Sequence, residues 1–141
     1  MAEAVVLQTS AFIDLLLGDA QGRAVADALR GRQVHVTDHE EVLVAIALRA
    51  RRERGLLSAP AFRRRIGRVA EAPFTVHSAR ELLVDAAARE HLRLDDALCV
   101  ELSHRLEAPM LTTDAALAAA WPRALLVRAE APKPLPAPHP R

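Results

Sequence analysis

Polar side chains follow three short apolar segments of this sequence, at the points where those segments end. They are Gln8, Thr9 and Ser10 after residues 4–7, Asp38, Glu40 and Glu41 after residues 34–36, and Thr112, Thr113 and Asp114 at the end of residues 110–112. Asp95 and Asp96 begin a further segment whose amino end could face the same way. In open parallel α/β sheets the active site forms outside the carboxyl ends of the strands. We therefore expect these acids to gather at one rim of one sheet.

Carboxylates that gather without matching Lys or Arg repel one another, and a hard divalent cation relieves that repulsion. Mg²⁺ and Mn²⁺ prefer carboxylate oxygens and water as ligands. Two such ions ~3.5–4 Å apart can activate a water molecule and stabilise the leaving oxygen of a phosphodiester. The residue types therefore predict a Mg²⁺ (or Mn²⁺) site that hydrolyses phosphodiester bonds.

The same acids could instead serve only as helix starts, where carboxylates accept hydrogen bonds from free N–H groups. The residues open to this interpretation are Glu41 (in a capping box with Asp38, the alternative pair being Thr37 and Glu40), Asp95, Asp96 and Asp114. Asp14 and Asp85 lie within amphipathic segments and are interpreted as solvent-facing. Cys99 is interpreted as a small core residue, because nothing near it in the sequence would lower its pKa.

Five short apolar segments alternate with longer amphipathic ones, which is typical of an α/β fold. The expected strands are Ala4–Leu7, Val34–Val36, Phe74–Val76, Met110–Thr112 and Leu125–Val127. These segments are apolar on both faces and are separated by expected helices, so they predict a buried, mainly parallel sheet covered on both sides. Residues 42–48 are apolar all round, which predicts that this helical stretch is buried.

Length and composition exclude several classes of protein. The chain has 141 residues, which fits one domain. No apolar run approaches the ~20 residues of a membrane helix, and the start lacks the pattern of a signal peptide. A single cysteine cannot form an internal disulfide, and no phosphate-binding glycine-rich loop is present. The expectation is a soluble, cytoplasmic protein. Residues 1–128 form the expected domain, and residues 129–141, with five of the nine prolines, a Pro-rich, disordered tail.

Two segments near the carboxyl end resemble motifs of the PIN-domain nucleases. Residues 93–100 (RLDDALCV) are similar to the family's R-x-x-D-A-x-x-V segment, and residues 108–117 (APMLTTDAAL) to its A-P-L-L-T-x-D-x-x-L segment. Residues 5–16 (VVLQTSAFIDLL) resemble the family's opening V-V-x-D-x-S-x-x-x-x-L-L, and residues 41–43 (EVL) its second acid. The resemblance covers residues 4–128, and the size of the chain suggests the VapC-like toxins of type II toxin–antitoxin pairs.

This resemblance implies a three-layer α/β/α PIN-like fold and Mg²⁺- or Mn²⁺-dependent endoribonuclease activity. It also implies a homodimer that is neutralised by a small VapB-like antitoxin. Carried over by position, the second, third and fourth acids of the family correspond to Glu41, Asp96 and Asp114, and Glu40 is a poorer match by one helix position. Ser10 matches a hydroxyl beside the first acid, and Thr112 matches the threonine of the last motif.

The first acid of the family pattern is replaced by Gln8. An amide offers a metal one carbonyl oxygen but no negative charge. The expected metal ligands are therefore Gln8, Glu41, Asp96 and Asp114, with a weakened affinity for the ion. Two functions follow, a ribonuclease toxin whose activity is reduced or abolished at Gln8, and a catalytically inactive PIN-domain module that binds an antitoxin or RNA. Gln8 is either natural or engineered.

Basic charge is concentrated in one part of the chain, although the net charge is only +1. Eight of the 18 arginines lie between residues 49 and 68, where Glu53 is the single acid. Such a face could follow an RNA backbone, be part of an antitoxin interface, or simply be solvated. The candidate RNA-binding residues are Arg49, Arg52, Arg63, Arg64 and Arg93.

Overall fold

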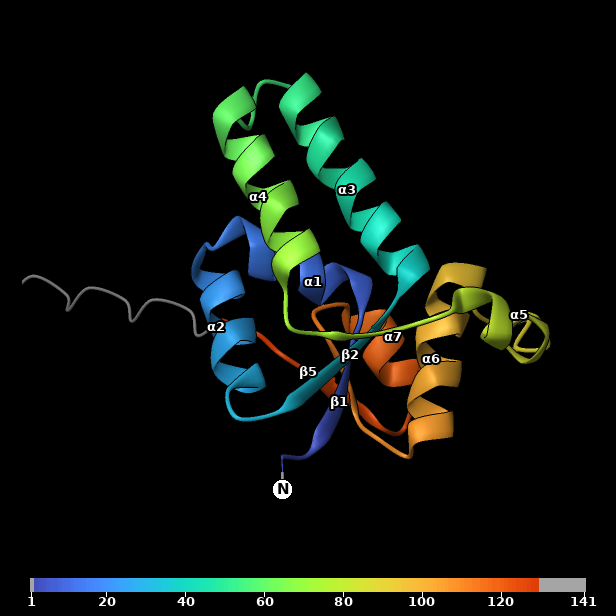
Figure 1. Cartoon of the computed structure of the whole chain (residues 1–141). Coiled ribbons are helices and arrows are strands. Elements are labelled where there is room, and N and C mark those ends of the chain that lie inside the picture. Colours follow the sequence, from blue (N-terminus) through green and yellow to red (C-terminus); the bar gives the residue numbers. More distant parts are fainter. Residues whose placement is uncertain (1, 130–141) are drawn as a thin grey trace, which may run out of the picture.

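The computed structural model describes residues 2–129, which form a five-stranded parallel sheet with helices on both faces (Figure 1). The strands are β1 (Ala4–Leu7), β2 (Gln33–Thr37), β3 (Thr75–His77), β4 (Met110–Thr112) and β5 (Ala124–Leu126). Their order across the sheet is β3-β2-β1-β4-β5, and every neighbouring pair is parallel. The predicted parallel α/β sheet is confirmed. The expected tail lies, from residue 130 on, outside the described residues.

The helices divide into two layers, one on each face of the sheet. They are α1 (Thr9–Leu17), α2 (Ala20–Leu29), α3 (Asp38–Glu53), α4 (Ala59–Glu71), α5 (Ala79–Ala87), α6 (Leu94–Leu106) and α7 (Ala115–Ala120). The first four supply apolar side chains to one core cluster, and the last three to the other. The arrangement is the three-layer α/β/α fold that the sequence resemblance implied.

Strand β1 shows how the two layers share the sheet, because successive side chains of a strand point to opposite faces. Val5 and Leu7 pack in the first cluster, and Val6 packs in the second. All three are completely buried, and each such side chain stabilises the fold by about 1.5–3 kcal/mol. Gln8 continues this alternation and so points to the α6 side of the sheet.

Side chains at the N-cap positions stabilise the starts of several helices. Thr37 and Glu40 form the reciprocal capping box of α3, Ser58 caps α4 with Pro60 in its first turn, and Asp114 caps α7. The alternative box of Asp38 with Glu41 does not form.

The starts of α1 and α6 position Gln8 and Asp96. Gln8 is the N-cap of α1, and its side chain accepts a hydrogen bond from the Ser10 N–H. Helix α6 begins at Leu94 after an Arg93 cap that forms no side-chain hydrogen bond. Asp96 therefore lies within the first turn of α6 and does not cap the helix, which leaves its carboxylate free for other contacts.

Helices α3 and α4 form an antiparallel hairpin that projects away from the sheet (Figure 1). The expectation that residues 42–48 are buried all round is wrong. Val44 and Leu48 are fully buried, but Val42 and Ile46 are 56% and 59% exposed. Because the hairpin stands beyond the sheet, α3 is covered only on the face that carries Val44 and Leu48, and Val42 and Ile46 line an open groove beside α4.

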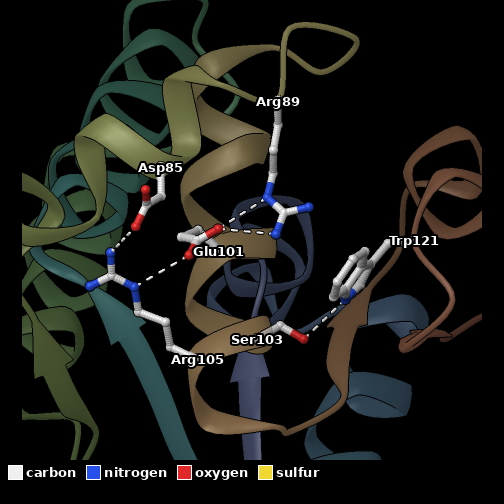
Figure 2. A network of polar contacts seen from close by, with 6 residues as sticks. All are labelled: Asp85, Arg89, Glu101, Ser103, Arg105 and Trp121. Atoms are coloured by element: carbon white, nitrogen blue, oxygen red, sulfur yellow. Dashed lines mark hydrogen bonds and ion pairs between the residues drawn. The ribbon is translucent and has the colours of Figure 1, made fainter.

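The pair α5 and α6 is joined by ion pairs around Glu101, whose side chain is only 7% exposed (Figure 2). Arg89 contacts one carboxylate oxygen at 3.0 Å and Arg105 the other at 3.3 Å. Arg105 also pairs with Asp85 at 2.8 Å. Asp85, expected to be solvent-facing, is thus an exposed partner in this network, and every charge in it meets an opposite one within the chain.

None of the helices within residues 2–129 combines the length and apolar character that crossing a membrane would require.

Candidate functional site

The strand order reverses between β1 and β4, and ligands of open α/β sheets bind where such a reversal opens a crevice. Leu7 of β1 pairs with Leu111 of β4, so the next residues, Gln8 and Thr112, leave the sheet side by side. The Gln8 N–H donates to the Leu111 carbonyl at 2.9 Å. The register of β1 and β4 therefore holds Gln8 next to Thr112, 104 positions away in the sequence. This agrees with the prediction that polar residues gather at the carboxyl ends of the strands.

The amide of Gln8 is fixed in one orientation by hydroxyl groups. Its Oε1 accepts hydrogen bonds from the Ser10 N–H at 3.1 Å, from the Ser10 hydroxyl, and from the Thr112 hydroxyl at 2.8 Å. With three donors on the oxygen, the amide nitrogen must point the other way. Nε2 donates to Asp96 Oδ1 at 3.4 Å. Gln8 therefore presents a hydrogen-bond donor, and no free oxygen, to the acidic side of the edge.

Asp96 and Asp114 are the two carboxylates that lie together here. The pKa of Asp96 is raised, first by desolvation and then by the charges of Asp95 and Asp114, while Arg93 opposes the shift. Arg93 pairs with Asp95 at 3.1 Å and remains 80% exposed. Asp114 accepts both capping hydrogen bonds of α7 through Oδ1, so Oδ2 is not used by the cap. The pair thus has an excess of negative charge that the chain itself compensates only in part.

Glu41 does not join this pair. It lines a groove of about 840 Å³ between α3 and α4, together with Asp38 and apolar side chains. Partial burial and the charge of Asp38 raise its pKa. Glu40 is the acid of α3 that points inward, as expected for a residue one position earlier on a helix that turns by about 100° per residue.

Glu40 is 1% exposed and lies against Thr9 of α1 and Cys99 of α6, one helical turn beyond Asp96. Its Oε1 accepts the Thr37 N–H of the capping box at 3.1 Å, and its Oε2 has no hydrogen-bond partner. Desolvation raises the pKa of Glu40 to about 8. At neutral pH this acid is therefore largely protonated. Cys99 beside it is fully buried, as expected of a core residue.

The donor set fits a divalent cation only in part. Among the residues that the structure describes, no three histidine, cysteine or acidic side chains converge closely enough to hold a metal ion. The expected convergence of Glu41, Asp96 and Asp114 therefore does not occur, because Glu41 faces the α3–α4 groove. Gln8 offers no free oxygen. Asp96 and Asp114 remain, and Mg²⁺ is usually held by one or two carboxylates together with waters and substrate phosphates.

Sequence reasoning missed one acid at this edge. Asp14 of α1 accepts a 2.8 Å hydrogen bond from the Thr113 hydroxyl, which also lies 3.0 Å from the Ser10 hydroxyl. Asp14 was interpreted as solvent-facing. The signal was available, since Asp14 follows Ser10 by four residues and side chains four apart share one helix face.

The candidate RNA-binding arginines occupy two places. Arg49, Arg52 and Arg63 surround one cavity on the α3–α4 hairpin, and Arg64 is exposed on α4. Arg93 lies apart from them, at the start of α6 beside the acidic pair. The hairpin and the edge of the sheet thus carry charge of opposite sign.

Known proteins resemble this chain in sequence and in structure. Ribonuclease VapC3 of Mycobacterium tuberculosis is 36% identical over 124 residues, which cover 86% of this chain and 90% of the relative. No protein-family model matches the chain.

Solved structures share the fold at lower sequence identity. PAE2754 from Pyrobaculum aerophilum has a TM-score of 0.64 and 20% identity, covering 87% of this chain and 82% of its own. A toxin–antitoxin complex from Klebsiella pneumoniae gives a TM-score of 0.60 and 18% identity over 86% of this chain and 95% of the matched one. Mycobacterium tuberculosis VapC20, a Sarcin-Ricin loop cleaving toxin, has a TM-score of 0.63 and 16% identity, covering 82% of this chain and 94% of its own.

Proposed function

Because the chain belongs to the VapC family of PIN-domain ribonucleases, we propose that it is the toxin of a toxin–antitoxin pair and hydrolyses RNA phosphodiester bonds. The observation that carries this proposal is the pairing of Asp96 with Asp114 at the edge where β1 and β4 end. Two carboxylates that repel each other favour the binding of a divalent cation. Such a cation can also neutralise the negative charge of an RNA phosphodiester during hydrolysis.

Mg²⁺ or Mn²⁺ is the proposed cofactor, held by Asp96 and Asp114. When bound, the ion would supply an activated water and charge neutralisation at the phosphodiester. Two protein carboxylates are few, so the affinity for the ion is expected to be low until substrate phosphates add further oxygens. Gln8 contributes a hydrogen-bond donor in place of a negative charge, which lowers that affinity further.

The other residues at this edge position the two acids. Thr112 donates to Gln8 Oε1 at 2.8 Å and accepts the Asp114 N–H at 3.0 Å, so one hydroxyl links β1 to the start of α7. Ser10 adds a second link between α1 and Thr113. The role of Ser10 and Thr112 in this proposal is to fix the distance between Gln8 and Asp114 rather than to bind the ion.

The paired comparison of the wild type with Gln8→Asp tests the proposal. Purified toxin free of antitoxin is given a structured RNA with Mn²⁺, with Mg²⁺ or with EDTA. We expect slow cleavage by the wild type, faster cleavage by Gln8→Asp, and none by either protein in EDTA. Asp96→Asn in the Gln8→Asp background is the matched control and should abolish cleavage. The absence of cleavage by both the wild type and Gln8→Asp would refute a nuclease site at this edge.

A catalytically inactive binding module is the second candidate function, and the orientation of Gln8 favours it. The Nε2 group lies 3.4 Å from Asp96 Oδ1, so the chain itself places a donor against the carboxylate that a cation would otherwise approach. This function predicts RNA or antitoxin binding that EDTA does not change, and no gain of cleavage in Gln8→Asp.

The antitoxin is the proposed protein partner, and the groove between α3 and α4 is its proposed site. The groove has an apolar floor that includes Phe62, Ile66 and Val69, and the exposed Val42 and Ile46 line it. An amphipathic helix suits such a groove. Ile46→Asp is expected to release a co-expressed antitoxin during purification, whereas Val84→Asp, at an even more exposed apolar residue of α5, should retain it.

A homodimer is also proposed, through the apolar surface of α5 and the edge strand β3. Leu83 and Val84 of α5 are 42% and 83% exposed, and Val76 of β3 is 47% exposed. An unpaired sheet edge beside apolar side chains favours association. Light scattering after gel filtration should give twice the mass of the chain for the wild type and a monomer for Val84→Asp.

A further inference from the structure

The carboxyl half of α3 and the amino half of α4 enclose a cavity of about 280 Å³ that is rich in arginine. Arg49, Arg52, Phe62 and Arg63 line it. The volume lies just below the roughly 300–1,000 Å³ of pockets for drug-sized ligands, so it suits one small group rather than a whole cofactor. Three guanidinium groups around one cavity favour an anionic group in it.

The charges around this cavity are poorly compensated within the chain. Arg49 pairs with Glu53 at 3.3 Å, but both side chains are about two-thirds exposed, and such pairs contribute little. Within the described part of the chain, Arg52 and Arg63 form no salt bridge. The positive surface continues over further hairpin residues, namely Arg51, Arg54, Arg64 and Arg68.

Helix stability accounts for only some of these arginines. Arg65 has a structural role, because it donates to the Leu16 and Leu17 carbonyls at the end of α1. Arg51 and Arg52 lie in the last turn of α3, where cations favour the negative end of the helix dipole. Arg63 and Arg64 lie in the amino half of α4, where the dipole gives no such benefit. Helix stability therefore does not explain why Arg63 lies with Arg52 in one cavity, whereas binding of an external anion would.

We propose that this cavity binds a phosphodiester group of an RNA that reaches from the hairpin to the acidic edge. This rests on the proposed ribonuclease function and adds a second contact site for its RNA substrate, away from the acidic edge. Arginine suits the task because its planar guanidinium binds phosphate oxygens in bidentate fashion. Phe62 supplies an apolar wall on which part of a base can stack.

The distance between the arginine cavity and the acidic edge sets a minimum length for the substrate. Arg52 lies twelve residues beyond Glu40 on α3, and Glu40 packs against α6 next to the turn that carries Asp96. Twelve residues of α-helix span about 18 Å. A mononucleotide cannot bridge such a distance, so an RNA of several nucleotides is the substrate that contacts both places.

Fluorescence anisotropy with a labelled RNA stem-loop in EDTA tests the proposal without any cleavage. The test variant is Arg52→Ala with Arg63→Ala in the full chain. The control variant is Arg30→Ala with Arg123→Ala. It removes two exposed arginines that precede β2 and β5, at the amino ends of the strands and away from the acidic site. All three proteins are first compared by thermal unfolding, since arginine-to-alanine changes at exposed positions should leave the fold intact.

We expect the test variant to bind RNA at least about tenfold more weakly and the log–log salt slope of binding to fall by roughly 0.7, the value for one lost contact to a single-stranded phosphate. The control should change the affinity less than about twofold, because it removes charge without removing a contact. Equal losses in the two variants, or no loss in the test variant, would overturn the proposal. A loss of binding to a poly-Asp peptide with unchanged RNA binding would also overturn it, in favour of an acidic protein partner. Because EDTA prevents cleavage, these outcomes are independent of whether the acidic edge is active.

Discussion

Two acids of helix α6, Asp96 and Glu101, lie five residues apart and have opposite surroundings. Glu101 is almost fully buried, and Arg89 and Arg105 each contact one of its oxygens (Figure 2). Asp96 is less buried and faces the charge of Asp114 and the amide of Gln8. A carboxylate with a structural role is neutralised within the chain, whereas the chain compensates the carboxylate at the edge of the sheet only in part.

This difference is informative because a buried carboxylate with a purely structural role is more stable when a cationic side chain of the same protein neutralises it. Burying an uncompensated carboxylate costs free energy, and the raised pKa of Asp96 reports that cost. Carboxylates with a pKa raised by burial and by neighbouring negative charge are typical of functional sites. Glu40 shows a third outcome, in which a buried acid without a cationic partner takes up a proton instead.

Glu101→Gln is expected to destabilise the fold by about 3 kcal/mol, since removing one partner of a buried ion pair leaves the other charges uncompensated. Urea unfolding measures the change in the free energy of unfolding. Asp96→Asn is the matched control on the same helix. It should leave stability unchanged or slightly higher, because it relieves repulsion. Similar losses in both variants would show that the two acids have the same structural role.

Glu40 is expected to make stability fall as the pH rises. Its pKa is raised from 4.5 to about 8 in the folded state, so the folded protein binds a proton that the unfolded chain releases. The resulting stability is fully present below about pH 4.5 and is lost as the pH rises through 8. Between pH 5 and pH 8 the loss should be about 3 kcal/mol. Urea unfolding at several pH values measures it.

Glu40→Gln is the control for that titration. Glutamine has the same shape and keeps the capping box of α3, but it does not titrate. The variant should therefore lose most of the pH dependence between pH 5 and pH 8. If the slope persisted in Glu40→Gln, its origin would lie in another group.

Thr112→Val is expected to destabilise the protein by about 1–2 kcal/mol. It removes a donor to Gln8 and the acceptor of the Asp114 N–H, both at a fully buried position. Thr113→Val is the neighbouring control. It removes the more exposed hydroxyl that contacts Asp14 and should cost less. A larger loss in Thr113→Val would place the main link of the edge at Asp14 instead.

Trp121→Phe should give the smallest effect, about 1 kcal/mol. The indole donates to the Ser103 hydroxyl at 3.0 Å and lies 5.2 Å from the Arg89 guanidinium (Figure 2). Phenylalanine keeps a ring beside Arg89 but loses the donor. The midpoint of thermal unfolding followed by circular dichroism measures the change. A loss as large as that of Glu101→Gln would mean that the network depends on the ring more than on the charges.

The fold was predictable because its signals are local. Apolar segments of three to five residues, with Thr37 and Asp114 as helix caps after two of them, indicated the parallel α/β order. The expected burial of residues 42–48 was wrong because an apolar composition does not reveal whether a second helix covers each face. In this chain α4 covers only part of α3, and Val42 and Ile46 are left exposed.

The candidate site was predictable in part. Gln8, Thr112 and Asp114 meet because β1 and β4 are neighbours, and the motifs placed them at the strand ends. The assignment of Glu41 over Glu40 depended on one helix position, which sequence spacing does not resolve. The contact of Asp14 with Thr113 joins α1 to the end of β4, and its helical spacing from Ser10 was its single signal in the sequence.

Residue types and spacings within short segments were enough to indicate the family, the layered α/β order and the acids at the strand ends. The packing of distant elements sets the rest. It directs the nitrogen of Gln8 at Asp96, buries Glu40 in protonated form while Glu41 faces a groove, and compensates Glu101 fully but Asp96 only in part. The physical reason is that charge, hydrogen bonding and burial depend on which distant side chains come into contact, and packing sets those contacts.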